Sequence, residues 1–413
     1  MFSTSSGDPP ALVVSRRSDG LRSSLSRAGP HLPALAGVFA ARGDCDRAAA
    51  GKGDGSSFLL GFFRAVLQTC GVAVSEFLKA CRRESTRYTP IWLMRQAGRY
   101  QPEYRAVRER VSFIDLCKRS ELAAEVTCLP VTQLGVDAAI VFADILLVLE
   151  PLEIGFEFIE SEGPRILRPV RTAEDIDAIG SGVDVEERLG YVMQTIRLCR
   201  QRLPAGVPLI GFSGAPFTLA SYLVEGGGSR DYLHTKKLML TDPPAWQALL
   251  GRLTDTVVCY LNAQVDAGAQ ALQVFDSWAG CLGVHDYDRY VKPHMSRLFA
   301  GLRPEVPVIH FSTGNPSLYP SMREAGGQVM GLDWRVDLGE QWDRLGQVAV
   351  MGNLDPYSLL APAKVLQERA QAVLEAARGR PGHIFNLGHG VPPQASVDKA
   401  RSLVDFVHEK SAR

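Results

Sequence analysis

The sequence predicts an α/β fold, a single (β/α)8 barrel of the TIM type whose active site lies at the carboxyl ends of the strands. From residue 75 onward, short apolar runs alternate with segments of helical periodicity, which is typical of a parallel sheet. Eight such runs occur, and polar residues or glycines follow each one, where barrels of this kind carry their chemistry. A doubly wound open sheet is the alternative, because periodicity does not reveal whether a sheet closes.

Each apolar run has the length of a buried strand. The first follows Pro90, a residue that suits the first position of a strand, and stops at Arg95. The second is followed by Asp144, the fourth by Asp276 and the sixth by Asp333. The predicted strands are residues 91–94, 138–142, 209–212, 271–275, 308–311, 329–332, 348–351 and 383–385.

The segments between the strands have helical periodicity. Ser75 and Glu76 are typical of a helix start, so we expect the folded domain, residues 75–413, to begin there. The stretch 149–184 is a longer excursion that we expect to hold a small hairpin around residues 160–164. The predicted helices are residues 120–134, 185–202, 244–267, 286–302 and 363–378.

Residues 1–74 differ in composition from the rest of the chain. Serine, arginine, glycine and alanine dominate and acidic residues are sparse, which is typical of a transit peptide. We therefore expect an organellar leader, with a plastid favoured and a cytoplasmic or mitochondrial location as alternatives. A disordered extension without an address is the other interpretation. The apolar stretch 58–74 is interrupted by Arg64 and is too short to span a membrane, so we expect no membrane anchor.

Composition excludes several classes of function. The net charge is zero, with 22% charged and 46% apolar residues, which argues against a nucleic-acid binder. The eight cysteines are spread without a C-x-x-C pair, as expected of thiols in a reducing compartment. Zinc-ligand spacing and the glycine-rich nucleotide motifs are absent from the sequence, although a metal site assembled from distant strands stays open.

Arg95 and Arg99 stand where the first strand ends, with Gly98 between them. In a loop, successive backbone amides form an anion-binding concavity, and guanidinium groups add bidentate recognition of carboxylates. A structural salt bridge to Glu103 or Glu109 is the alternative interpretation. Arg105, Arg108 and Arg110 lie near those glutamates and are expected on a solvated helix face.

The other strand ends carry further candidates. Asp144 ends a run with almost nothing polar in it, so it is either a structural acceptor or a reactive acid. Asp276 with Ser277, and Asp333, allow the same two interpretations. His389 lies between Gly388 and Gly390, which permit close backbone approach, so we expect a hydrogen-bond partner or acid for a ligand, with a core histidine as the alternative.

These residues favour one class of chemistry. A G-x-S-x-G elbow does not accompany Ser277, which argues against acyl transfer, and paired glutamates at neighbouring strand ends are lacking, which argues against a glycosidase. Two arginines, an aspartate, a serine and a histidine around a barrel mouth suit a polycarboxylate substrate and proton transfer.

Several long motifs resemble the uroporphyrinogen decarboxylase family, over residues 77–408. The two longest are Pro-Ile-Trp-Leu-Met-Arg-Gln-Ala-Gly-Arg-Tyr at 90–100 and Gly-Phe-Ser-Gly-Ala-Pro-Phe-Thr-Leu-Ala-Ser-Tyr-Leu-Val-Glu-Gly at 211–226. Shorter ones surround Asp144, Ser277, Asp333, Asp355 and His389. Gln101 and the segment 149–151 depart from the family pattern, but neither is a matched site residue.

The resemblance implies a (β/α)8 fold and a homodimer that needs neither a metal nor an organic cofactor. It also implies the decarboxylation of the four acetate side chains of uroporphyrinogen III to coproporphyrinogen III in haem and chlorophyll biosynthesis. By the match, Asp144 accepts the pyrrole N–H groups and stabilises a cationic intermediate in which the substrate pyrrole is the electron sink. The substrate-binding residues implied by the match are Arg95, Gln96, Ala97, Gly98, Arg99, Phe113, Asp144, Tyr222, Ser277 and His389.

The proton donor is left open by the sequence. We place it at Arg95 or Arg99, or at a water that they hold, although an arginine normally stays charged and is an awkward acid. Two other functions were weighed. A zinc-dependent corrinoid or thiol methyltransferase on the same barrel would need a cysteine ligand at a late strand end, and a porphyrinogen-binding scaffold would be expected to lack Arg95, Arg99 or Asp144.

Overall fold

The computed structural model describes residues 75–159, 163–180 and 184–413. The expected leader, residues 1–74, lies outside the described residues, together with the apolar stretch 58–74 and the tip of the expected hairpin at 160–162.

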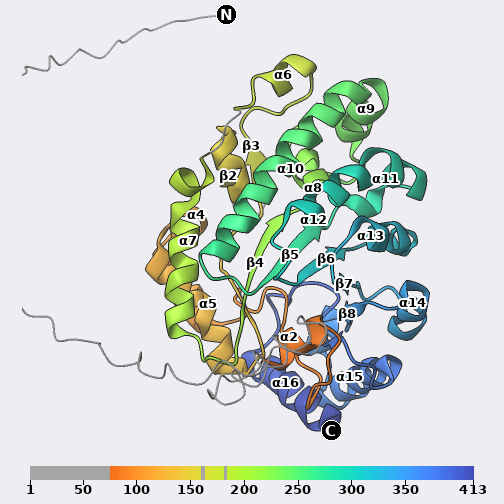
Figure 1. Cartoon of the computed structure of the whole chain (residues 1–413). Helices are drawn as coiled ribbons and strands as arrows, with labels where there is room; N and C mark the ends of the chain where they lie inside the picture. The colour runs from red at the N-terminus through yellow and green to blue at the C-terminus, as the bar shows by residue number, and fades with distance from the viewer. Residues whose placement is uncertain (1–74, 160–162, 181–183) are drawn as a thin grey trace, which may run out of the picture. The chain divides into compact units, whose positions relative to one another are not determined.

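A seven-stranded parallel sheet forms the centre of the described structure, in the order β1-β4-β5-β6-β7-β8-β9 (Figure 1). In register, Ile210 lies beside Ala271, and Leu272 lies beside Val308. Seven of the eight expected strands are thereby confirmed. The strands are β1 (Ala139–Ile140), β4 (Leu209–Gly214), β5 (Ala271–Asp276), β6 (Val308–Ser312), β7 (Val329–Gly331), β8 (Ala349–Met351) and β9 (His383–Ile384).

The expected first strand, residues 91–94, makes only one isolated bridge, between Ile91 and Phe385. Its amides are satisfied by side chains instead of by a neighbouring strand. The N–H of Ile91 donates to Asp137 Oδ2 at 2.7 Å and that of Met94 to Asn386 Oδ1 at 3.0 Å. The segment still contacts both edges of the sheet, because Asp137 N donates to Ile91 O at 2.8 Å and Phe385 N donates to Pro90 O at 2.8 Å.

Helices follow most strands and cover the outer face of the sheet (Figure 1). The expected helix 286–302 is wrong as a single element. The chain breaks at Val291, where φ is −123°, because Pro293 has no amide hydrogen to donate and a new helix starts at Lys292. The helices are α2 (Glu76–Cys81), α3 (Pro102–Arg108), α4 (Phe113–Lys118), α5 (Ser120–Leu134), α6 (Ala173–Asp177), α7 (Val185–Arg202), α8 (Pro216–Glu225), α9 (Leu233–Thr241), α10 (Pro243–Asp266), α11 (Val284–Tyr290), α12 (Lys292–Gly301), α13 (Tyr319–Ala325), α14 (Leu338–Leu345), α15 (Ala363–Ala377) and α16 (Val397–Ser411).

Two local predictions are confirmed outside the sheet. Ser75 caps α2, because its hydroxyl accepts the N–H of Leu78. The excursion after β1 holds the expected hairpin, in which β2 (Phe156–Ile159) pairs antiparallel with β3 (Gly163–Ile166).

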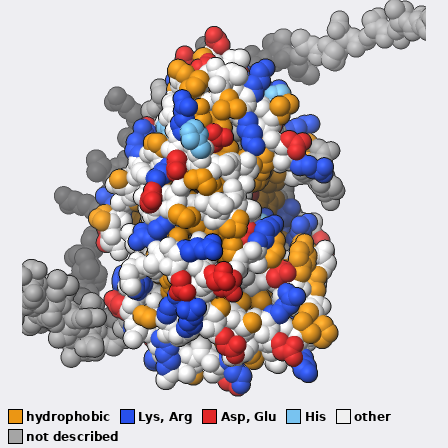
Figure 2. Space-filling model, turned by 90° about the vertical axis from the view of Figure 1, so that its right-hand side faces the viewer, with side chains coloured by type: hydrophobic (Ala, Val, Ile, Leu, Met, Phe, Trp, Pro, Cys, Tyr) orange, Lys and Arg blue, Asp and Glu red, His pale blue; other side chains and the backbone are white. Residues whose placement is uncertain are grey.

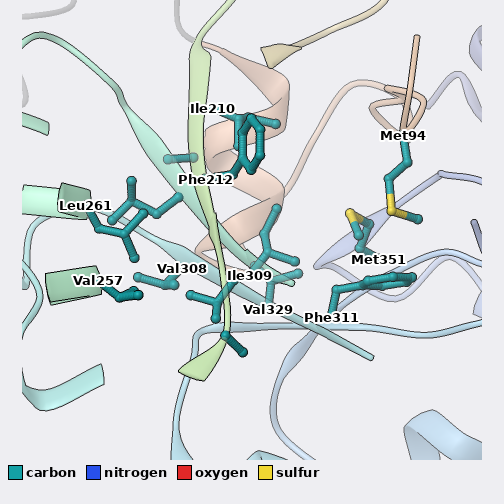
Figure 3. Packing of buried hydrophobic residues seen from close by; sticks show 14 of the residues in the cluster. Met94, Ile210, Phe212, Val257, Leu261, Val308, Ile309, Phe311, Val329 and Met351 are labelled. Atoms are coloured by element: carbon teal, nitrogen blue, oxygen red, sulfur yellow. The ribbon is translucent and has the colours of Figure 1, made fainter. Parts of the chain in front are cut away.

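The core lies on both faces of the parallel sheet. Inside its curve, Met94 and Met351 lie side by side near Phe311, while Ile210 and Phe212 project from β4 (Figure 3). The amide of Gln273 contacts Met94 Sδ at 3.7 Å, so the few polar groups there are tied to sulfur. Fully burying each such apolar side chain stabilises the fold by about 1.5–3 kcal/mol, so this packing holds the strand ends in place.

The surface agrees with the neutral net charge. Lysine and arginine side chains are interspersed with acidic ones on the face shown in Figure 2. The cysteines among the described residues are free thiols. Within residues 75–159, 163–180 and 184–413, every helix is too short or too polar to cross a bilayer.

Candidate active site

The carboxyl ends of the parallel strands bring the expected site residues to one edge of the sheet. Ser277 directly follows β5, Asp333 follows β7 by two residues, and His389 follows β9 by five. Asp144 follows β1, and Tyr222 lies in α8, which begins two residues after β4. We call Arg95, Asp144, Tyr222, Ser277 and His389 the strand-end site.

The loop 95–99 is built to present arginine. Arg95 has φ of 60°, in the left-handed region that a non-glycine residue rarely adopts, and its side chain is exposed. Gln96 fixes the loop from below, because its buried side chain accepts the N–H of Leu93 and donates to Ala138 O, both at 3.1 Å. Arg99 is also exposed, and Arg105 bonds its carbonyl oxygen at 2.8 Å. The loop is therefore held from within while both guanidiniums face outward.

The backbone amides of this loop divide into two groups. Those of Gln96 and Gly98 are occupied, since they donate to Leu93 O and to Gln101 Oε1, both at 2.9 Å. Those of Ala97 and Arg99 have no partner among the described residues. An anion at the loop therefore finds two guanidiniums and the amides of Ala97 and Arg99, whereas Gln96 and Gly98 shape the loop.

The glycines beside His389 are explained by close contacts. A Cβ on Gly390 would lie 2.7 Å from Arg95 Cγ, so this glycine makes room for the stem of Arg95. A Cβ on Gly388 would lie 2.8 Å from the carbonyl carbon of Asp333. The His389 loop therefore packs between the Arg95 and Asp333 loops, which links three strand ends.

Asp144 is a half-buried carboxylate with few partners. Its Oδ1 accepts the N–H of Leu146 at 2.9 Å, and this is its hydrogen bond within the described residues. Burial raises the pKa of Asp144 to about 6, while the Leu146 amide and the charge of Arg95 partly oppose the rise. At pH 7 the group is roughly nine tenths ionised, so an anion stands close to Arg95 with free acceptor capacity.

His389 is neutral at physiological pH. Burial and the charges of Arg95 and Arg335 lower its pKa to about 4. Its Nδ1 accepts the N–H of Gly390 at 2.7 Å, so the proton of the neutral ring is on Nε2. His389 can therefore donate a hydrogen bond, but it is not a general acid at pH 7. Of the two ligand roles expected from the sequence, the structure favours the first.

Tyr222 and Ser277 are linked through Trp278. The rings of Tyr222 and Trp278 lie 3.8 Å apart at 30°. Burial and the charge of Asp144 raise the pKa of Tyr222 to about 12, so its hydroxyl stays protonated. Trp278 is in turn anchored by Thr218, whose Oγ1 accepts the Trp278 N–H and donates to Asp276 Oδ1, both at 3.3 Å.

Phe113 begins α4 and lies beside the strand that leads to Asp144. Its ring meets Phe142 at 5.8 Å and Phe158 at 5.0 Å, both edge to face. Arg108 lies over the same ring at 5.6 Å. Arg108 is therefore half-buried against an aromatic ring, unlike the solvated position expected from the sequence.

Arg335 is a cation of this region that the sequence reasoning missed. Its Nη1 donates to Asp333 Oδ2 at 2.6 Å, and its guanidinium lies 3.8 Å from the centre of the Trp334 ring. The Trp334 ring meets His389 edge to face at 6.1 Å. The guanidinium is therefore mounted rigidly near His389, with its side chain 45% exposed. An arginine two residues after a strand-end aspartate was the available signal.

The alternative role of Arg95 and Arg99 in structural salt bridges is not observed, since neither pairs with a carboxylate among the described residues, Glu103 and Glu109 included. The described part of the chain also contains no group of three or more histidine, cysteine, aspartate or glutamate side chains arranged to hold a metal. The arrangement is one carboxylate, neutral hydrogen-bond donors and surrounding arginines. It suits an anionic ligand whose centre carries hydrogen-bond donors or positive charge.

A family model described as uroporphyrinogen decarboxylase matches residues 73–410. A uroporphyrinogen decarboxylase of Carboxydothermus hydrogenoformans is 53% identical over 338 residues, which cover 81% of this chain and 96% of the relative. Another from Sorangium cellulosum is 53% identical over 334 residues, covering 80% of this chain and 95% of the relative.

Among solved structures, a methyltransferase from Methanosarcina mazei matches with a TM-score of 0.69 at 17% identity, covering 81% of this chain and 98% of that one. A putative vitamin-B12 independent methionine synthase from Listeria monocytogenes gives 0.51 at 10% identity, covering 82% and 99%. At such identities the likeness concerns the fold alone, so it does not favour the methyltransferase alternative.

Proposed function

The chain belongs to the uroporphyrinogen decarboxylase family, and from this membership we propose how its residues act on the substrate. It is a carboxy-lyase of porphyrin and haem biosynthesis. The reaction removes the carboxyl groups of the four acetate side chains of uroporphyrinogen III, giving coproporphyrinogen III and carbon dioxide.

The periphery of the substrate carries carboxylates, which the strand-end site meets with donors. Arg95 and Arg99 hold them through their guanidiniums, and the amides of Ala97 and Arg99 add hydrogen bonds. Tyr222 donates through a hydroxyl whose raised pKa of about 12 keeps it protonated, and His389 donates through Nε2–H. Ser277 adds a hydroxyl, and Phe113 packs on the ligand. Gln96 and Gly98 hold the shape of the loop.

Asp144 serves the centre of the substrate. Its second oxygen is free to accept pyrrole N–H groups, because only Leu146 bonds the carboxylate. Removing carbon dioxide from an acetate leaves an electron pair on its methylene carbon. A protonated pyrrole ring accepts that pair, so an ionised Asp144 stabilises the cationic ring at low local dielectric.

One proton per acetate completes the balance, since each CH2–COO⁻ group gains a proton and loses carbon dioxide to become a methyl. We place proton delivery at the Arg95 and Arg99 loop, from a guanidinium or from a water that it holds. His389 is excluded as a donor at pH 7 because its pKa is about 4. These roles need no group beyond the chain and its substrate.

The observation that carries this mechanism is an unsaturated carboxylate of pKa about 6 beside Arg95. The test of the function is incubation of anaerobically reduced uroporphyrinogen III with chelator-treated protein, counting product carboxylates by chromatography and mass spectrometry. We expect products with seven, six, five and finally four carboxylates. Products that keep all eight carboxylates, with added zinc or without it, would contradict the function.

We further propose that the sheet closes into the (β/α)8 barrel, with residues 91–94 as its first strand. The hydrogen bonds of Ile91 to Asp137 and of Pro90 to Phe385 support this. Amide hydrogen exchange tests it, because closure predicts slow exchange at both Asp137 and Phe385. Fast exchange at either amide favours an open sheet.

We also propose a homodimer. Leu167, Leu233 and Leu240 are more than half exposed, at 57%, 67% and 55%, and a second copy would remove such surface from water. Light scattering coupled to size-exclusion chromatography is expected to give twice the mass of the chain at micromolar concentration. A monomer mass there would contradict the dimer.

Residues 1–74 are proposed as an organellar leader, with a plastid favoured, ahead of the catalytic domain 75–413. This location would place the enzyme in chlorophyll as well as haem biosynthesis. Serine- and arginine-rich composition supports the proposal, and the family match begins only at residue 73. A fluorescent fusion of residues 1–74 should enter the organelle. A uniformly cytosolic signal would refute the leader.

A further inference from the structure

Two adjoining cavities lie at the amino-terminal ends of β7, β8 and β9, the end opposite to the strand-end site. Their volumes are about 340 and 430 Å³, and they share Arg83 and Gln347 as lining residues. Gln328 and Val348, which also line them, directly precede β7 and β8. We call this pair of cavities the basal cleft, lined chiefly by Arg82, Arg83, Arg323, Gln347 and Arg380.

The basal cleft has an excess of positive charge. Its lining contains four arginines and one acidic residue, Asp343. That carboxylate is already paired with Arg380 at 2.6 Å and with Arg378 at 3.2 Å. Arg82, Arg83 and Arg323 have no carboxylate partner among the described residues. Three guanidinium charges are therefore left around one hollow.

Arg83 is held in the cleft by its surroundings. It has φ of 58°, and a Cβ on Gly382 would lie 2.9 Å from Arg83 Cγ, so this glycine makes room for its stem. Its Nη2 donates to Gln347 Oε1. Its Nε is shielded from water and has no partner within the described part of the chain. Because buried N–H groups are normally hydrogen-bonded, this atom indicates a missing acceptor.

The opposite wall of the cleft is equally fixed. The Arg380 guanidinium lies 4.3 Å from the centre of the Trp342 ring, and the Trp342 indole N–H donates to Val348 O at 2.9 Å. These contacts serve stability, which is the usual role of residues at this end of a barrel. Stability does not account for the unpaired charges of Arg82, Arg83 and Arg323.

We propose that the basal cleft is a binding site for a small polyanion, with Arg83 and Arg323 as its main ligands. Several guanidiniums without carboxylates bind densely charged groups such as phosphates or polycarboxylates. The modest volume and the polar lining favour a compact anion over a tetrapyrrole. Binding would tie α2, α13 and the loops before β8 and β9 together, so it would stabilise the folded chain.

Isothermal titration of the full chain with pyrophosphate and with citrate, at constant ionic strength, tests the proposal. One saturable site of micromolar to submillimolar affinity is expected for at least one probe. The preferred probe shows whether the site selects phosphate or carboxylate. Absence of saturable binding by both probes would overturn the proposal.

Variants locate the binding. Arg83→Gln should weaken affinity at least tenfold, and Arg323→Gln, which changes only a half-buried side chain with a 3.4 Å contact to Gln347 O, should weaken it about threefold to tenfold. Arg303→Gln is the matched control, because it removes an exposed arginine paired with Asp266 on α10, and it should leave affinity unchanged.

The strand-end site also binds anions, so Arg95→Gln provides the second control. Binding that survives Arg95→Gln and is lost in both basal variants supports the proposal. Binding that is lost in Arg95→Gln but kept in Arg83→Gln and Arg323→Gln would assign the anion to the strand-end site and overturn it. Decarboxylation is not needed for any of these readings.

Discussion

Asp144 and Asp333 both follow apolar strands of the same sheet, but their surroundings differ in kind. Asp333 is fully buried, and its carboxylate accepts hydrogen bonds from Gly314 N at 2.8 Å, Arg335 N at 2.8 Å and Arg335 Nη1 at 2.6 Å. Asp144 is half-buried and accepts one. A saturated carboxylate has its capacity used within the fold, whereas an unsaturated one keeps it for a ligand. The comparison therefore separates a structural acid from a working acid.

Asp144→Asn should produce the largest effect on activity. The shape of the side chain is kept while the negative charge facing the pyrroles is lost, so kcat should fall by roughly a thousandfold. Thermal unfolding should change little, because a single hydrogen bond is affected. Asp405→Asn, at an exposed aspartate of α16, is the control and should retain full activity. Near-normal kcat in a folded Asp144→Asn protein would remove this residue from the mechanism.

Asp333→Asn should act on stability first. An amide cannot accept from Gly314 and from both donors of Arg335 equally well, and Arg335 loses its ion pair. The free energy of unfolding should fall by about 3 kcal/mol, measured by urea denaturation. A variant of wild-type stability that lacks activity would show that Asp333 works in the chemistry instead.

The pH dependence distinguishes the two acids further. Asp144 is needed as a carboxylate, and its pKa in the folded protein is about 6. The value of kcat/KM should therefore be constant above about pH 7 and should fall tenfold per pH unit well below 6. The residual activity of Asp144→Asn should lack this acidic limb. An identical limb in wild type and variant would assign it to another group.

His389→Gln should have the smallest effect. Glutamine can replace the Nε2–H donor of a histidine that is already neutral, so kcat/KM should fall by about tenfold or less. The pH profile between 5 and 8 should keep its shape, because the pKa of His389 is about 4. A profile that changes around pH 6.5 would mean that His389 titrates during turnover.

Much of this architecture could be predicted from the sequence, because strands buried on both faces are continuous apolar runs. The run before Asp276 and the run before Ser312 were found within one residue of their ends. Residues 91–94 could not be judged, since the partners of their amides are the side chains of Asp137, Gln96 and Asn386, which lie far away or beyond a turn. Hydrophobic pattern does not encode such bonds.

The candidate site was predicted as a set of strand-end residues, but their roles were not. Asp144, Asp276 and Asp333 look alike in sequence, because the number of hydrogen bonds that each accepts depends on loops from other strands. The neutral state of His389 depends on Arg335, which is distant in the chain. Thr218 gave no signal, since its hydroxyl acts only where α8 meets the end of β5.

The central claim is that Asp144 is the unsaturated, ionised carboxylate of this site. Carbon-13 NMR of protein labelled at aspartate carboxyl carbons measures its titration directly, with the resonance assigned by its absence from Asp144→Asn. The account predicts a midpoint near pH 6 that matches the acidic limb of kcat/KM. A midpoint below 4 would show a carboxylate stabilised by hydrogen bonds or charges that the structure does not provide, and would contradict the account.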